Sequence, residues 1–168
     1  MACELTSGNT QNVCEEAGGV VEWYASSKAN VASYTELAGS ITAITMVALK
    51  KFFAIKVDPA TSNFTDAAAG DLASGLGFTP TATIITKGYT PADYTFQKEL
   101  QAGRIVLLAK KSNGTYVMMF RDYGGKALVS LDSGTGFETF NGATITVTGV
   151  ETQATIPVDS GIIAALIA

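Results

Sequence analysis

The second half of the chain alternates short apolar runs with glycine-containing turns, and this pattern limits the fold more than any other feature. Residues 104–110 and 115–120 are apolar runs separated by Asn113-Gly114. Residues 126–131 follow Gly124-Gly125, and residues 144–148 follow Asn141-Gly142. Asn-Gly suits the positive φ angles of a type I′ hairpin turn, whose twist matches that of its strands. The pattern therefore predicts an antiparallel meander of about four strands.

These predicted strands differ in how they would be covered. Residues 105–109 and 116–120 are apolar throughout, so both faces of each strand should be buried. Residues 144–148 instead place Ile145 and Val147 on one face and threonines on the other. A sandwich or barrel supplies one cover for a doubly buried strand, and a helix or a neighbouring subunit supplies the other.

Strand signals in the first half are less regular. Residues 20–25 and 52–57 are rich in β-branched and aromatic residues, and Asp58-Pro59 stops the second run. Residues 81–87 predict a Thr/Ile strand. Residues 41–49 fit a strand or a helix equally well, because a short apolar run does not decide between them. The glycines and Pro80 within residues 70–80 predict a long loop.

One helix is predicted over residues 90–103. Thr90 can cap its first turn, Pro91 suits the first helical position, and Asp93 lies in the first turn. Apolar residues recur at positions 92, 96 and 100, and Gly103 ends the pattern. A strand through residues 94–96 is the alternative.

These elements predict a mainly β protein, either a β-sandwich or a partly closed barrel of antiparallel hairpins, with one flanking α-helix. Residues 1–19 are polar and predict an N-terminal arm. Residues 20–168 predict a single β-rich domain with an apolar C-terminal tail. Trp23 and Tyr24 are expected to pack in the core or at a subunit contact.

The composition favours a protein whose surface is covered by neighbours. Hydrophobic residues make up 47% of the chain and charged residues 15%, with a net charge of −4; mean hydropathy is +0.26. Average soluble domains have about 25% charged residues. An Ala-rich and Thr-rich monomer is the alternative interpretation. The acidic balance disfavours tight binding of a phosphate backbone, but it suits a surface past which DNA slides without sticking.

The chain has few groups for catalysis or metal binding. It has no histidine, which removes His-based triads and His metal ligands. Cys3 and Cys14 lack a zinc-finger spacing, and they are expected as reduced thiols, with a local disulfide as the less favoured alternative. Residues 37–49 are too few and too Thr-rich to span a bilayer, and no secretory signal is recognised at the start. We therefore expect a non-enzyme with no catalytic, cofactor-binding or metal-binding residues, no cofactor and no membrane contact.

One motif is instead typical of an enzyme. Asp132-Ser133-Gly134 follows an apolar strand, and Asp159-Ser160-Gly161 repeats the tripeptide. This resembles the Asp-Ser/Thr-Gly motif of aspartic proteases, in which two aspartates share a proton. The copies are too close for two lobes, so a protease would need a homodimer that uses Asp132 from each subunit. The competing interpretation is that Asp-Ser-Gly makes tight turns.

The order of several segments resembles a family of small virion proteins from tailed phages that infect Bacteroidetes. The start Met1-Ala2-Cys3, then Cys14, then Gly18-Gly19-Val20 resembles the N-terminal pattern of that family. The C-terminal half resembles it more closely, through Ile105-Val106-Leu107-Leu108, Asn113-Gly114-x-Tyr116, Gly124-Gly125-Lys126-Ala127-Leu128, Ser133-Gly134-Thr135, Asn141-Gly142 and Gly149-Val150-Glu151-Thr152-Gln153-Ala154.

The resemblance implies a structural virion protein similar to tail-tube subunits. Such subunits resemble a β-sandwich with one flanking helix, form rings, typically of six copies, by continuing sheets between subunits, and stack through loops and arms. The implied partners are copies of the chain itself, other virion proteins, and passing double-stranded DNA that is not bound specifically. The implied location is the phage tail, assembled in the cytoplasm of the bacterial host.

Three segments are expected to make the contacts: residues 3–13, residues 58–80 and residues 162–166. A capsid decoration protein or a head–tail joining protein is the alternative role.

Overall fold

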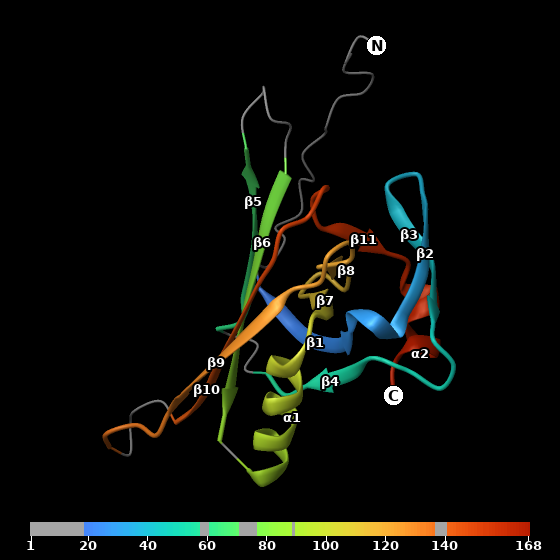
Figure 1. Cartoon of the computed structure of the whole chain (residues 1–168). Coiled ribbons are helices and arrows are strands. Elements are labelled where there is room, and N and C mark those ends of the chain that lie inside the picture. Colours follow the sequence, from blue (N-terminus) through green and yellow to red (C-terminus); the bar gives the residue numbers. More distant parts are fainter. Residues whose placement is uncertain (1–18, 58–60, 71–76, 89, 137–140) are drawn as a thin grey trace.

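The computed structural model describes residues 19–57, 61–70, 77–88, 90–136 and 141–168, and these form two stacked β-sheets with two helices (Figure 1). One sheet has seven strands in the order β2-β3-β11-β8-β7-β1-β4, and the other has four in the order β5-β6-β10-β9. In chain order the elements are β1 Val20–Ser27, the 3-10 helix η1 Lys28–Asn30, β2 Val31–Leu37, β3 Ser40–Met46, β4 Phe53–Ile55, β5 Asn63–Ala69, β6 Gly77–Lys87, α1 Pro91–Ala102, β7 Ile105–Lys111, β8 Tyr116–Met119, β9 Lys126–Asp132, β10 Gly142–Thr148, β11 Ile156–Val158 and α2 Ser160–Leu166. The predicted mainly β sandwich is confirmed.

The main core lies between the two sheets. Trp23, Leu107 and Phe120 contribute from the seven-stranded side, while Ile84 and Ile145 contribute from the four-stranded sheet. Each of these side chains is at most 1% exposed. The alternation predicted for residues 144–148 is confirmed, because Ile145 and Val147 are buried and the threonines are not.

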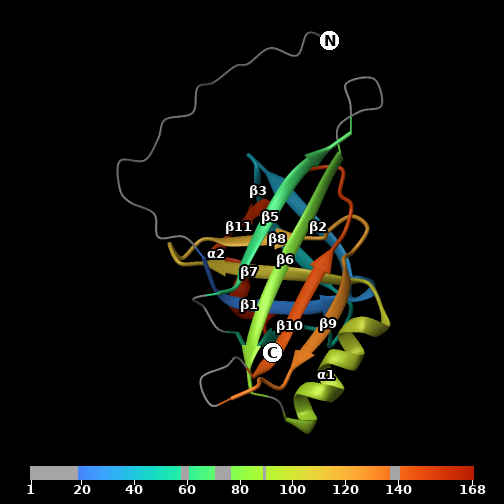
Figure 2. The ribbon, with the colours of Figure 1, turned by 90° about the vertical axis from the view of Figure 1, so that its left-hand side faces the viewer.

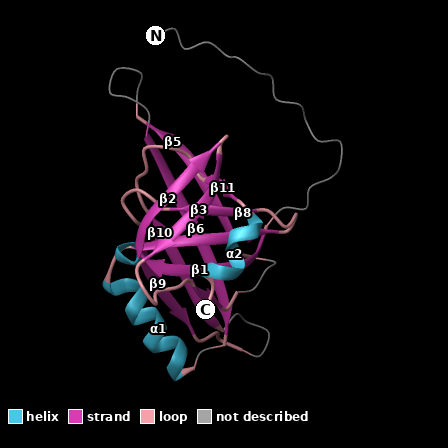
Figure 3. Ribbon diagram, turned by 90° about the vertical axis from the view of Figure 1, so that its right-hand side faces the viewer, coloured by secondary structure: helices cyan, strands magenta, loops and turns pink. Residues whose placement is uncertain are grey.

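A second core lies on the other face of the seven-stranded sheet. Val106 and Leu108 of β7 point into it, and α2 covers it with Ile163 and Leu166 (Figure 3). β7 is therefore buried on both faces, as its sequence predicts. The final residues also join this sheet region, since Phe52 N donates to Leu166 O over 2.9 Å and Ala168 N donates to Phe52 O over 2.9 Å.

Helix α1 begins and ends where the sequence predicts. The Thr90 hydroxyl accepts a hydrogen bond from Asp93 N over 3.3 Å, and Asp93 Oδ2 accepts from Thr90 N over 2.8 Å, which completes a capping box. The Thr90 hydroxyl also donates to Asp93 Oδ2 over 2.7 Å, and this hydrogen bond and the one from Thr90 N lower the pKa of the Asp93 carboxyl. Gly103 follows the last turn, and Leu100 packs into the main core.

The predicted four-strand meander is wrong at its central step. β7 pairs with β8, and β9 pairs with β10, but β8 and β9 lie in different sheets. Between them the chain bends sharply, with positive φ angles at Phe120 (60°) and Gly124 (73°). The Phe120 ring lies against Gly125 and Gly149, so that close packing, rather than a hairpin, directs the chain across the sandwich.

Two smaller predictions also need correction. Gly114 has a φ of 84° but Asn113 has no positive φ, so their turn is not type I′. Gly114 N donates to Lys111 O and Lys111 N donates to Thr115 O, which fits a three-residue loop with a glycine bulge. The loop expected over residues 70–80 is wrong from Gly77 onward, where β6 begins. The undecided residues 41–49 form strand β3 up to Met46.

Candidate assembly surfaces

The four-stranded sheet leaves two long edges open in the part of the chain that the structure describes. β5 and β9 are its outermost strands, and each has seven residues. The charged residue of β5 is Asp66, whose Oδ2 accepts a hydrogen bond from Thr155 N. β9 carries charge at its ends, on Lys126 and Asp132. Both edges therefore have an uncharged outer face along their middle, without the lysines that commonly protect an edge strand from pairing.

The outer face of this sheet is covered with threonine. The strand registers place one threonine directly opposite another at Thr65 and Thr81, Thr81 and Thr148, and Thr83 and Thr146. Thr79 and Thr144 extend the same face, which Figure 2 shows toward the viewer. Charged residues stand at its margins on Lys87, Lys126 and Asp132. The result is a polar but nearly uncharged surface on a sheet whose other face is the main core.

Large apolar side chains are exposed on and beside this sheet. Leu128 (58% exposed) lies on the outer face of β9 and Leu131 (55% exposed) near its end. A groove of about 200 Å³ between β9 and α1 is lined in part by Leu131 and Tyr94. A subunit with few charges and these exposed apolar groups has the surface expected of an interface.

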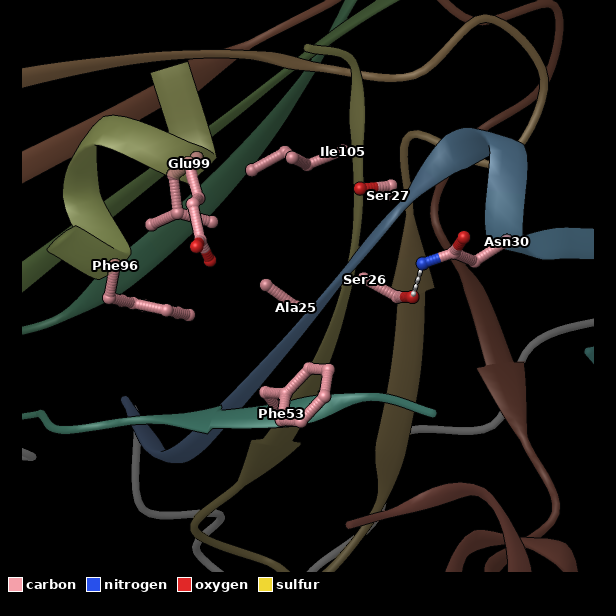
Figure 4. Close-up of a pocket in the computed structure, with 9 residues that line it drawn as sticks. Ala25, Ser26, Ser27, Asn30, Phe53, Phe96, Glu99 and Ile105 are labelled. Carbon is pink, nitrogen blue, oxygen red and sulfur yellow. Dashed lines mark hydrogen bonds between the residues drawn. The ribbon is translucent and has the colours of Figure 1, made fainter. Parts of the chain in front are cut away.

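A second groove, also of about 200 Å³, lies between α1 and the seven-stranded sheet. Figure 4 shows Phe96 and Glu99 of α1 on one side of it and Ala25 of β1 and Phe53 of β4 on the other. Glu99 is the charged residue of its lining. A mainly apolar groove with a single carboxylate can receive an apolar side chain, but the lining lacks a paired acid and base or a nucleophile–base pair for chemistry.

A buried polar cluster joins two of the crossings between the sheets, the one from β8 to β9 and the one from β10 to β11. Arg121 (2% exposed) donates from Nη1 to Ala154 O over 3.0 Å and from Nη2 to Gln153 Oε1 over 2.6 Å. Glu151 (3% exposed) accepts from Asp122 N over 2.9 Å. The segment after β10 is thus fixed to the segment after β8, which holds the two sheets in one arrangement.

The cluster perturbs its own carboxyl groups in opposite directions. Burial raises the pKa of the Glu151 carboxyl, and hydrogen bonds from Asp122 N and Tyr123 N offset this only in part. Burial also acts to raise the pKa of Asp122, but hydrogen bonds from Thr152 and Tyr34 and the positive charge of Arg121 outweigh it, so the pKa is lowered. Sequence inspection did not find this cluster. Two adjacent charges directly after an apolar strand, at Arg121 and Asp122, were the available signal.

The two Asp-Ser-Gly motifs serve as a turn and a helix cap. Asp132 Oδ1 accepts from Gly134 N over 2.9 Å, and Asp159 Oδ1 accepts from Gly161 N over 2.9 Å at the start of α2. Asp132 ends a strand of the four-stranded sheet, whereas Asp159 follows a strand of the other sheet, and both are exposed. Within one subunit the structure does not bring the two aspartates together as a pair.

The segments predicted to make contacts are only partly described. Residues 3–13, with Cys3, and also Cys14 lie outside the described residues, as do residues 58–60 and 71–76 of the 58–80 segment. In the 162–166 segment, Ile163 and Leu166 are buried within the subunit, so α2 uses its apolar face internally.

Two further kinds of feature are absent from the described residues. Among them, no group of three or more His, Cys, Asp or Glu side chains is placed to hold a metal ion. None of the described helices is long and apolar enough to cross a membrane.

Comparison with known proteins gives no match: no family model, curated protein or solved structure is similar to this chain.

Proposed function

We propose that the chain is a structural virion subunit of the tail-tube type, which assembles into stacked rings that enclose a path for DNA. It works by burial of surface between copies, and none of its residues performs chemistry. The observation that carries the proposal is the pair of open, matched edges on the four-stranded sheet. Partners are copies of the chain itself and other virion proteins.

The strand directions of this sheet suit a ring. β5, β6, β10 and β9 are antiparallel at each step, so the two outer strands run in opposite directions. When a copy related by simple rotation places its β5 beside β9, the new pair is again antiparallel. Both edges are seven residues long, so their lengths match, and the ladder continues along the part of β9 that α1, packed near Val129 and Leu131, leaves uncovered.

The position of the rest of the subunit sets the curvature of such a ring. The seven-stranded sheet and both helices lie on one side of the four-stranded sheet (Figure 1), with α1 beside β9 (Figure 2). Joined sheets must curve away from this bulk, and the threonine face then becomes the inner, concave surface. With strands about 4.8 Å apart, six such sheets would close into a ring roughly 37 Å across between opposing backbones. A polar lining with few charges lets a phosphate backbone pass without being held.

Negative-stain microscopy of Ala67→Lys and Ala43→Lys tests the proposal. Both alanines are exposed strand residues, but Ala67 lies on the β5 edge and Ala43 on β3 of the other sheet. Wild type and Ala43→Lys should form hollow rings or tubes of uniform diameter. Ala67→Lys should lose them, because each subunit then carries a positive charge at the joint. Rings that survive in Ala67→Lys, or a wild type that stays monomeric or dimeric at every protein and salt concentration, would overturn it. The second result would favour a decoration or joining role.

A further inference from the structure

Two exposed leucines mark opposite ends of the β2–β3 hairpin. Leu37 is 68% exposed and lies beside the turn at Ala38-Gly39, where β2 passes into β3. Leu49 is fully exposed at 102% and lies in the turn that follows β3, which is closed by the hydrogen bond from Lys50 N to Val47 O over 2.9 Å. The chain thus places one large apolar side chain beyond each end of the same hairpin.

The backbone at both ends is in the left-handed region. Ala38 has a φ of 53° and Leu49 a φ of 64°; among the described non-glycine residues, the remaining positive φ is at Phe120, which is buried in the main core. Residues other than glycine, asparagine and aspartate are disfavoured in the left-handed region. An isolated subunit gains nothing from a leucine that is both strained and solvated. Such strain is typically retained where the side chain is needed for contact.

The charges beside the two leucines are complementary. Glu36 precedes Leu37, and Lys50 follows Leu49; all four residues are exposed. One end of the hairpin therefore presents an apolar group with a negative charge, and the other presents an apolar group with a positive charge. Like ends would repel, whereas unlike ends attract.

The two ends also face opposite ways along the molecule. In Figures 1 and 2 the Ala38-Gly39 turn lies toward the end where β6 begins, and in Figure 1 the Val47–Lys50 turn lies toward the end where α1 packs. The strands of the four-stranded sheet connect these same two ends. Copies joined side by side through that sheet would present the Leu37 end on one side of the ring and the Leu49 end on the other.

We infer that Leu49 and Lys50 of one copy bind Glu36 and Leu37 of a second copy in the next ring, head to tail. The inference rests on the proposed function. The sheet edges form each ring, and the contact inferred here joins one ring to the next. A head-to-tail contact uses two different surfaces and can repeat without limit, as a tube requires. The contact buries two leucines that water otherwise surrounds and pairs one carboxylate with one ammonium group.

A charge exchange tests which surfaces meet. Glu36→Lys alone and Lys50→Glu alone should each raise the protein concentration needed for tubes by at least about tenfold, while rings remain. The double variant Glu36→Lys/Lys50→Glu should restore stacking, because the pair is then merely reversed. Glu99→Lys, at an exposed site of α1 on the groove toward the seven-stranded sheet, is the control for charge alone and should stack like wild type. Single variants that stack normally, or a double variant that is no better than either single, would overturn the inference.

Leu49→Asn tests the apolar part without straining the fold. Asparagine tolerates the left-handed conformation, so the isolated subunit should melt at the same temperature or higher, and only stacking should weaken. Loss of subunit stability with normal stacking would show that Leu49 is structural and would overturn the inference. Wild-type rings that never stack would overturn it alone, whereas a wild type without rings or longer assemblies would overturn the proposed function as well.

Discussion

Replacing Gly125 with alanine tests the packing that carries the chain from one sheet to the other. A Cβ at Gly125 would lie 2.6 Å from Val147 Cγ1 and 2.8 Å from Phe120 Cγ, well inside the 3.4 Å at which ordinary contact begins. Both neighbours are fully buried. The Phe120 ring is also closed in on another side, because a Cβ on Gly149 would lie 2.7 Å from its Cδ1. Overpacking of this kind costs about 1–3 kcal/mol, which is roughly 2–4 °C in Tm for each kcal/mol in a chain of this length.

Gly103→Ala is the matched control. A Cβ there would meet nothing within 4 Å, and its φ of −145° is extended backbone that alanine adopts freely. Its free energy of unfolding should stay within about 0.5 kcal/mol of wild type. Urea unfolding, followed by the fluorescence of the buried Trp23, the one tryptophan of the chain, measures both variants. A Gly125→Ala midpoint equal to that of Gly103→Ala, with unchanged m, would refute the argument that Phe120 is held between the two glycines.

Two further predictions concern charged and capping groups. Thr90→Ala removes the hydroxyl that accepts from Asp93 N, and it should lower the free energy of unfolding by about 1 kcal/mol; an unchanged urea midpoint would contradict the role of the cap. Glu151→Gln removes a carboxyl whose pKa burial raises. A raised folded-state pKa means that the native protein binds the proton more tightly than the unfolded chain does, so this stabilisation is present at acidic pH and is lost as the pH rises. The stability of wild type relative to Glu151→Gln should therefore increase from pH 7.5 to pH 5, by at most about 1.4 kcal/mol per pH unit. Urea unfolding of both proteins measures this difference in the free energy of unfolding, and a difference that is constant with pH would refute the raised pKa of Glu151.

The sequence predicts local structure better than strand pairing. The helix was recognised because Thr90, Pro91 and Asp93 act on groups within one turn, and the structure confirms the resulting capping box. The doubly apolar runs around β7 and β8 likewise indicate burial without reference to distant residues. The partition of strands between two sheets was missed because it depends on packing of the Phe120 ring against Gly125 and Gly149, which are not adjacent to it in sequence.

The start of β6 shows how a local signal misleads. Pro80 indicates a loop, since proline cannot donate to a strand ladder. In the structure Pro80 pairs with Asp66 of β5, while β10 has already ended at Thr148, opposite Thr81. The pairing nevertheless continues past Pro80, because Gly149 N donates to Pro80 O over 3.3 Å and Phe78 pairs with Glu151, so β6 tolerates one missing donor next to the end of β10. These partners are distant in the sequence, so the proline alone does not reveal the strand.

The sequence predicts only part of the threonine face and does not predict its edges. The alternation at residues 144–148 shows a polar face, but the matching threonines of β5 and β6 join it only through strand order. The charge complementarity of the hairpin ends likewise depends on their placement at opposite ends of one hairpin.

Hydrogen exchange, compared between dilute and assembled protein, tests the central claim most directly. Edge-to-edge pairing predicts that amides of β5 (Asn63–Ala69) and β9 (Lys126–Asp132) gain protection on assembly, while β4 (Phe53–Ile55), an edge of the other sheet, does not. Assemblies in which β5 and β9 exchange as fast as in the dilute subunit would contradict the account.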